Sequence, residues 1–145
     1  MSKRLYCTFH LDRLSFGIDV LTIQEVLRPQ KMQTVPHAPD IVRGLINLRG
    51  QIVTAIDLRR RLALPQSTSD EPPMSIVVRS EGAPVSLLVD GVGDILELDD
   101  ADASPPPETL RGQARELVDA VFKLDGSLLL ILDVARVLQV RTAAS

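Results

Sequence analysis

The sequence predicts a mainly β protein made of two similar lobes, and three observations support that prediction. Aliphatic residues dominate an apolar fraction of 45%, whereas aromatic residues make up only 3% of the 145 residues. A core of Val, Ile and Leu is typical of strands. Short apolar runs separated by turn residues follow one another along most of the chain. Finally, a unit of strand, glycine turn, strand and Asp-capped helix occurs twice.

The first half of the chain is predicted to contain four strands and two short helices. Apolar residues recur at helical spacing over residues 20–27, which predicts a short helix that ends before Pro29. A second helix is predicted over residues 58–62, with Asp57 at the N-cap position. The predicted strands are residues 5–11, 14–19, 44–48 and 51–56.

The second half begins after a Ser-, Asp- and Pro-rich linker over residues 65–73. Residues 99–112 contain three consecutive prolines, which lack backbone donors, so this segment is predicted to be an extended surface connector. A helix is predicted over residues 134–138, capped by Asp133. The predicted strands are residues 74–79, 84–89, 92–98, 117–124 and 127–132, with turns around Glu81-Gly82 and Asp125-Gly126.

The repeat is found by counting along the sequence. A constant shift in residue number, which we call the repeat offset, carries Asp57 onto Asp133 and Leu62 onto Leu138 without a gap. Upstream, a slightly smaller shift carries Asp19 onto Asp90, each at the end of a predicted second strand. Lobes of about 70 residues are only marginally stable alone, so we expect the two lobes to share a core or an interface.

Composition favours a soluble protein that is not exported. No apolar run approaches the roughly 18 residues that a membrane span requires, and no signal peptide follows the start. Cys7 is the only cysteine, which excludes an internal disulfide and fits a reducing compartment. Residues 1–69 hold ten Lys/Arg and five Asp/Glu, whereas residues 70–119 hold three and twelve. Such asymmetry suits docking between proteins.

The chain offers few groups for catalysis or for metal binding. His10 and His37 stand alone, without Cys or carboxylates at ligand spacing. There is no phosphate-binding glycine loop and no G-x-S-x-G motif. We therefore predict no catalytic residue, no metal ligand and no cofactor. The basic run at residues 59–61 is the only candidate nucleic-acid patch, but it lacks interleaved aromatic residues, so nucleic-acid binding is disfavoured.

Residues 44–59 read G-L-I-N-L-R-G-Q-I-V-T-A-I-D-L-R. They resemble the signature of the CheW-like family, G-x-x-N-L-R-G-x-I-V-P-x-x-D-L-R, and the resemblance extends over about residues 5–139. Thr54 stands where the family usually has Pro, and Ala120 where its second lobe usually has Gly. Neither change threatens the predicted lobes.

The resemblance implies a fold of two interlocked five-stranded SH3-like β-barrels with short helices, within one domain over residues 1–145. Subdomain one is expected at approximately residues 14–64 with part of the C-terminal segment. Subdomain two is expected at approximately residues 74–132 with part of the N-terminal segment.

The resemblance also implies a function in chemotaxis signal transduction. The protein is expected to be a non-enzymatic cytoplasmic adaptor that couples methyl-accepting chemoreceptors to a CheA-type histidine kinase, without direct membrane insertion. Its expected partners are the regulatory domain of the kinase and the cytoplasmic tip of the receptors, which recruit it to membrane arrays. Two alternatives stay open: a CheW-like adaptor of a non-flagellar pathway such as gliding, pilus-based motility or development, and a small enzyme or ligand-binding barrel.

Site residues are carried over from the family position by position. Physical chemistry supports one of them independently, because the planar guanidinium of Arg49 on a hairpin turn suits a carboxylate. That carboxylate is expected to be Glu25, in a structural link, or an acidic side chain of the receptor, and the two roles do not exclude each other. The expected receptor-binding residues are Ile23, Glu25, Gly44, Arg49 and Ile95, and the expected kinase-binding residues are Ile18 and Val20.

Overall fold

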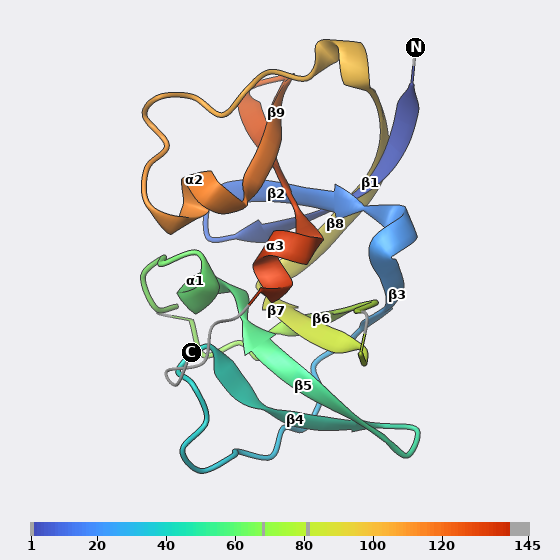
Figure 1. Cartoon of the computed structure of the whole chain (residues 1–145), viewed down its shortest axis with the longest axis vertical. Coiled ribbons are helices and arrows are strands. Elements are labelled where there is room, and N and C mark those ends of the chain that lie inside the picture. The colour runs from blue at the N-terminus through green and yellow to red at the C-terminus, as the bar shows by residue number, and fades with distance from the viewer. Residues whose placement is uncertain (1, 68, 81, 140–145) are drawn as a thin grey trace.

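Two five-stranded sheets make up most of the protein, for which the computed structural model describes residues 2–67, 69–80 and 82–139 (Figure 1). We call the first sheet the split lobe, because its strands come from both ends of the chain, and the second sheet the central lobe. The split lobe has the order β8 (Gly91–Asp99), β1 (Lys3–Leu11), β2 (Leu14–Asp19), β10 (Ser127–Leu132) and β9 (Val118–Leu124). The central lobe has the order β3 (Ile23–Leu27), β6 (Met74–Val78), β7 (Val85–Val89), β5 (Gln51–Asp57) and β4 (Val42–Leu48).

The helices of the described residues are short and lie between or beside the sheets. The 3-10 helix η1 (Val20–Thr22) leads from β2 in the split lobe to β3 in the central lobe, and η2 (Asp100–Asp102) follows β8. Figure 1 shows α1 and α3 at the waist between the lobes. The α-helices are α1 (Leu58–Arg61), α2 (Gln113–Leu117) and α3 (Val134–Leu138). None of them has the length and apolarity that crossing a membrane requires.

Each sheet curls until the segment after one edge strand meets the opposite edge strand. In the central lobe, Gln33 and Leu45 exchange backbone hydrogen bonds of 2.9 and 2.8 Å. In the split lobe, Ser104 and Val121 exchange two bonds of 2.8 Å. These bridges close the ends of both sheets, which would otherwise present unpaired donors and acceptors. The predicted fold class, mainly β with two five-stranded barrel-like units and short helices, is confirmed.

The internal repeat is also present in three dimensions. Strands β4 and β9, at 42–48 and 118–124, have the same length and are separated by the same repeat offset as Asp57 and Asp133. Asp57 accepts a hydrogen bond from the Arg60 backbone N–H at 3.3 Å, and Asp133 accepts the corresponding bond from Arg136 at 3.2 Å. The two hairpins even share a register shift near their helix-proximal ends. The predicted helices at 58–62 and 134–138 are confirmed to within one residue.

The lobes share one hydrophobic core, as expected for two units of this size. The stacked rings of Phe9 and Phe16, with centroids 5.7 Å apart, lie in this core on the split-lobe side. Ile76 and Leu87 of the central lobe belong to the same cluster, and so does Val137 of α3. Burial of such apolar surface from both sheets is the main attraction that holds the lobes together.

The predicted helix over residues 20–27 is wrong. Only η1 is helical there, and the rest is β3, which pairs with β6. Within β3 the side chains of Glu25 and Leu27 are half-buried, whereas those of Gln24 and Val26 are exposed, which is the alternation of a strand. Pairing with an open sheet edge outweighed a short and weak helical pattern. Helix α2 is not among the predicted helices: residues 113–116 lie between the predicted connector at 99–112 and the predicted strand at 117–124, and Leu117 ends the helix instead of starting the strand.

The expected residue ranges of the two subdomains do not match the sheets. Strand β2 was grouped with the first subdomain, but it pairs with β1 in the split lobe. Strands β6 and β7 were grouped with the second, but β7 lies parallel to β5 in the central lobe. Parallel pairing of this kind joins strands that no hairpin connects, so sequence order does not reveal it. The turn predicted at Glu81-Gly82 includes Glu81, which lies outside the described residues.

Candidate partner-binding surface

Arg49 occupies the turn between β4 and β5 and forms an ion pair with Glu25 of β3. Arg49 and Gly50 both have positive φ, 52° and 85°, and the Gly50 N–H donates to Oδ1 of Asn47 at 2.9 Å. This turn geometry directs the Arg49 side chain back across the end of the lobe. Its Nη1 donates to Oε1 of Glu25 at 3.3 Å, and its Nη2 makes a second, shorter contact with Oε2. The predicted contact between Arg49 and Glu25 is confirmed.

The pair joins two strands that lie at opposite ends of the central sheet. Because β3 and β4 are the two edges in the order β3-β6-β7-β5-β4, a contact between β3 and the β4–β5 turn helps to close the barrel. The hydrogen bond and the charge of Glu25 raise the pKa of Arg49. The Arg49 side chain is still 68% exposed, against 25% for Glu25. Its unused N–H donors therefore face solvent, so the structural link does not prevent a partner contact.

Ile23 and Glu25 lie on opposite faces of the central sheet, because β3 has a register shift between them: Ile23 stands opposite Val78 and Glu25 opposite Val77. Ile23 is half-buried and packs against the shared core. Ile23 therefore belongs to the shared core and not to the ion pair, whereas the neighbouring Val26 is 41% exposed.

Gly44 is buried and does not offer a surface to a partner. A Cβ atom at this position would lie 2.6 Å from the backbone oxygen of Gln33, which is the residue that closes the barrel. The expectation of a direct receptor contact is therefore corrected: Gly44 keeps the space that the closing bridge needs.

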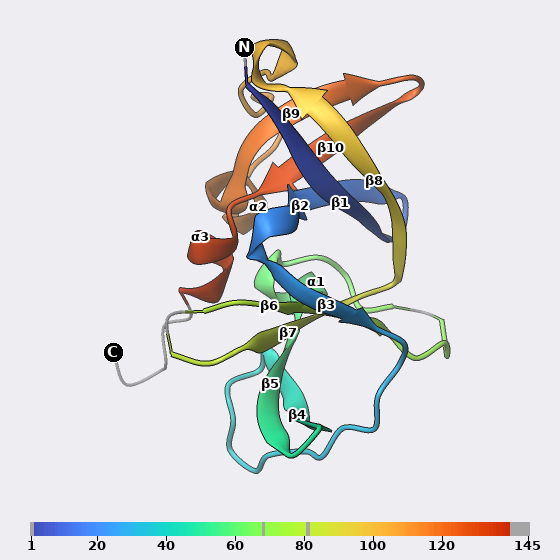
Figure 2. The ribbon, with the colours of Figure 1, turned by 90° about the vertical axis from the view of Figure 1, so that its right-hand side faces the viewer.

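Ile95 lies in the other lobe, on β8, and does not contact the ion pair. It is 58% exposed and stands opposite Cys7 of β1. Leu5, two residues from Cys7 on the same face of β1, is also exposed. Figure 2 shows β3 and β8 on one side of the molecule, one in each lobe. The residues carried over from the family thus lie on both lobes.

The two residues assigned to the kinase have different environments. Ile18 is fully buried in the shared core, so the expectation that it contacts the kinase is corrected. Val20 begins η1 and is half-buried. It lines a surface groove of about 510 Å³ together with Lys3, Arg4, Leu5, Asp19 and Leu21.

Sequence reasoning missed Leu21, the most exposed large apolar side chain among the described residues, at 81%. Oδ1 of Asp19 accepts a hydrogen bond from the Leu21 N–H at 2.9 Å and so holds η1 in place. The signal that was available is the Asp19 cap followed by Val20 and Leu21 at the exit of a strand. The incorrect helix prediction concealed it.

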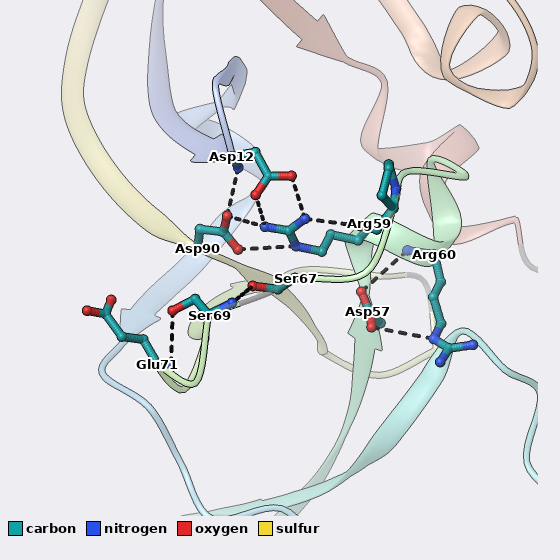
Figure 3. Close-up of polar contacts among 9 residues, drawn as sticks. Asp12, Asp57, Arg59, Arg60, Ser67, Ser69, Glu71 and Asp90 are labelled. Atoms are coloured by element: carbon teal, nitrogen blue, oxygen red, sulfur yellow. Dashed lines mark hydrogen bonds and ion pairs between the residues drawn. The ribbon is translucent and has the colours of Figure 1, made fainter.

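The basic run at residues 59–61 does not form a free basic surface. Arg59 is buried and bound by the carboxylates of Asp12 and Asp90, and only Arg60 is exposed (Figure 3). Within the described ranges, no three His, Cys, Asp or Glu side chains are placed to hold a metal ion.

Comparison with known proteins agrees with this geometry. Residues 5–142 match the model of the CheW-like domain. The chain belongs to the CheW-like family. It is 32% identical over 133 residues to the chemotaxis protein CheW of Klebsiella aerogenes, a match that covers 92% of this chain and 80% of the relative. It is 26% identical to the chemotaxis protein CheW of Treponema pallidum, covering 88% of this chain and 77% of that protein.

A solved structure extends the similarity to the whole CheW-like fold. The crystal structure of the scaffolding protein TtCheW from Thermoanaerobacter tengcongensis superposes with a TM-score of 0.85 at 25% identity, covering 97% of this chain and 95% of that one. The predicted resemblance is confirmed, and this chain is a CheW-like protein of the chemotaxis adaptor and scaffold type.

Proposed function

We propose that this CheW-like protein couples methyl-accepting chemoreceptors to a CheA-type histidine kinase and carries out no catalysis itself. The observation that supports this most strongly is the exposed guanidinium of Arg49, held at the end of the central lobe by Glu25 in a chain of the CheW-like family. An arginine fixed in this way offers a pre-organised fork of donors to an acidic side chain of a partner.

The receptor surface of this proposal uses Glu25 and Arg49 of the central lobe and Ile95 of the split lobe. The kinase surface uses Val20 with its neighbours Leu5 and Leu21, whose exposed apolar area suits the apolar core of a protein interface. The protein would act in the cytoplasm and reach membrane arrays only through these partners. No covalent chemistry is needed, since linking two partners raises their local concentration.

Replacement of one side chain tests the receptor contact. We expect Arg49→Ala to weaken binding to the isolated cytoplasmic tip of a receptor by about tenfold or more, because loss of a charge-assisted hydrogen bond costs about 1.5–3 kcal/mol. Binding to the regulatory domain of the kinase should change little, and the circular dichroism spectrum should stay the same. Titration calorimetry with each partner separately measures both affinities.

Arg111→Ala is the matched control, because Arg111 is an exposed arginine in the segment between η2 and α2. It should leave both affinities unchanged. Equal receptor affinity of Arg49→Ala and the original protein would contradict the proposed contact. Unfolding of Arg49→Ala would instead assign Arg49 to a purely structural role.

A further inference from the structure

Arg59, Asp12 and Asp90 form a charged cluster between the lobes, which we call the interlobe clamp (Figure 3). Nη1 and Nη2 of Arg59 donate to Oδ2 and Oδ1 of Asp12, each at 2.7 Å. Nε donates to Oδ1 of Asp90 at 3.3 Å, and Nη2 makes a shorter contact with Oδ2 of Asp90. Nη1 also donates to the Pro65 carbonyl at 3.1 Å. One guanidinium is thus held by two carboxylates and a carbonyl.

The position of each residue in the chain shows what the clamp joins. Arg59 is the second residue of α1, directly after β5 of the central lobe. Asp12 lies in the turn between β1 and β2 of the split lobe, and Asp90 is the single residue between β7 and β8, where the chain crosses from one lobe to the other. The clamp therefore fastens the central lobe to a hairpin of the split lobe and to the crossover.

The carboxylates are themselves held in place by the backbone. The Asp12 N–H donates to Oδ2 of Asp90 at 2.7 Å, and the Asp90 N–H donates to the His10 carbonyl at 3.1 Å. Asp12 has φ of 54°, a conformation that Asp adopts more readily than most residues. Both acceptors are thus pre-positioned for the arginine.

The clamp both holds the two lobes together and fixes their relative orientation. The Arg59 side chain is only 6% exposed, whereas those of Asp12 and Asp90 are 56% and 27% exposed. Moving the lobes apart would leave the buried guanidinium without its partners, which is strongly unfavourable. This cost adds to the cost of losing apolar contact between the lobes. Apolar contacts are non-directional, whereas bidentate arginine–carboxylate pairs fix an orientation.

The other end of α1 is fastened in a similar way. Nε of Arg61 donates to the Val137 carbonyl at 2.8 Å, and Nη2 donates to the Arg136 carbonyl at 2.8 Å. Both carbonyls belong to α3, which follows β10 of the split lobe. Helix α1 is therefore bound to split-lobe segments on two sides.

We propose that Arg59 is a positioning residue that fixes the orientation of the central lobe relative to the split lobe. Its effect on partner linkage rests on the proposed function, because that function places partner surfaces on both lobes. Its effect on lobe orientation does not depend on the proposed function.

Distances between spin labels on the two lobes test the orientation directly. Labels are attached to cysteines introduced at the exposed positions Gln51 in the central lobe and Lys123 in the split lobe, in a full-length Cys7→Ala background. Pulsed electron paramagnetic resonance should give a narrow distribution for the parent protein. Arg59→Met should broaden it about twofold or more, because Met keeps an unbranched apolar side chain but cannot hold either carboxylate.

Arg60→Met is the matched control, since Arg60 is the next residue of α1 but is exposed and pairs with Asp57. It should leave the distribution unchanged. Asp12→Asn is the second variant, because Asn tolerates the turn conformation and Asp12 is exposed enough for the chain to fold without its charge. It should broaden the distribution by a smaller amount. Unchanged widths in Asp12→Asn and in a folded Arg59→Met would overturn the proposal.

Assembly with partners supplies the functional readout. Asp12→Asn should keep its affinity for each partner alone within about twofold, while the amount of three-component complex falls about threefold, because pre-organisation between the two surfaces is lost. Equal loss of single-partner binding would contradict a positioning role. If the parent protein binds neither partner, the proposed function fails, while the distance measurement still decides the role of Arg59.

Discussion

Three consecutive arginines have three different environments in this protein. Arg59 is buried between two carboxylates, Arg60 is exposed, and Arg61 donates to carbonyls of α3. Burial lowers the pKa of Arg61, whereas the hydrogen bonds to Asp12 and Asp90 raise the pKa of Arg59 in spite of burial. The sequence shows the run but not these environments, since they depend on which face of α1 meets the split lobe.

Two buried serines give a prediction about stability at the residue scale. Ser75 and Ser86 lie on neighbouring strands of the central lobe, and within the described residues their hydroxyl oxygens have no hydrogen-bond partner. A buried polar group without a partner costs about 1–3 kcal/mol, part of which is recovered when the group is removed. Ser86→Ala should therefore raise the free energy of unfolding in urea by about 1 kcal/mol.

Ser127→Ala provides the comparison, because Ser127 is exposed at the start of β10. Its effect should stay within about 0.5 kcal/mol. Destabilisation by Ser86→Ala would show that the hydroxyl makes a favourable bond that the static structure does not contain.

The clamp also predicts a dependence of stability on pH. The hydrogen bonds from Arg59 lower the pKa of Asp12. A carboxyl whose pKa is lower in the folded state contributes stability that is fully present above its ordinary pKa of about 3.9 and is lost as the pH falls through the lowered value. The original protein should therefore be more stable than Asp12→Asn at about pH 6, and the difference should shrink below about pH 4. Urea unfolding at several pH values measures the difference, which would stay constant if Asp12 were not ionised in the clamp.

At the scale of elements, the two hairpins of the repeat were predicted closely and the segment between β2 and β4 was not. Strong turn residues and apolar runs mark the hairpins locally, so 51–56 and 127–132 needed no information from the rest of the chain. The conformation of β3 depends on pairing with β6, which lies far from it in sequence, beyond β4, β5 and α1. Such pairing overrides weak local preference. As a result Glu25 meets Arg49, but from a strand and not from the expected helix.

Gly44 supplies a prediction about barrel closure. Because a Cβ there would meet the Gln33 backbone oxygen at 2.6 Å, Gly44→Ala should force β4 and the closing segment apart. Overpacking of this kind costs about 1–3 kcal/mol, which denaturant unfolding will show. Receptor affinity should fall only as far as Gly44→Ala disorders the backbone around Arg49.

The split lobe offers the matched position. Ala120 stands one repeat offset from Gly44 and already carries a Cβ atom beside the equivalent bridge. Ala120→Gly should therefore change stability by about 1 kcal/mol or less, mainly through chain flexibility. A stable Gly44→Ala with an intact Gln33–Leu45 bridge would refute the steric argument.

At the scale of the whole molecule, the repeat and the shared core were predictable, but the division of strands between the lobes was not. The repeat offset is visible in the sequence, and small lobes need a common core. Which hairpin joins which sheet is decided by the parallel pairs β2–β10 and β5–β7, which leave no local pattern. The clamp was missed for the same reason, because Asp12, Arg59 and Asp90 meet only after the chain has crossed between the lobes twice.

The central claim is that the exterior of the two joined lobes links a receptor to a kinase. Co-sedimentation of the kinase regulatory domain with vesicles that display the receptor's cytoplasmic tip tests it most directly. We expect the kinase domain to sediment only when this protein is added, and to remain in solution when Arg49→Ala replaces it. Sedimentation that does not depend on the protein, or none when all three components are present, would contradict the account.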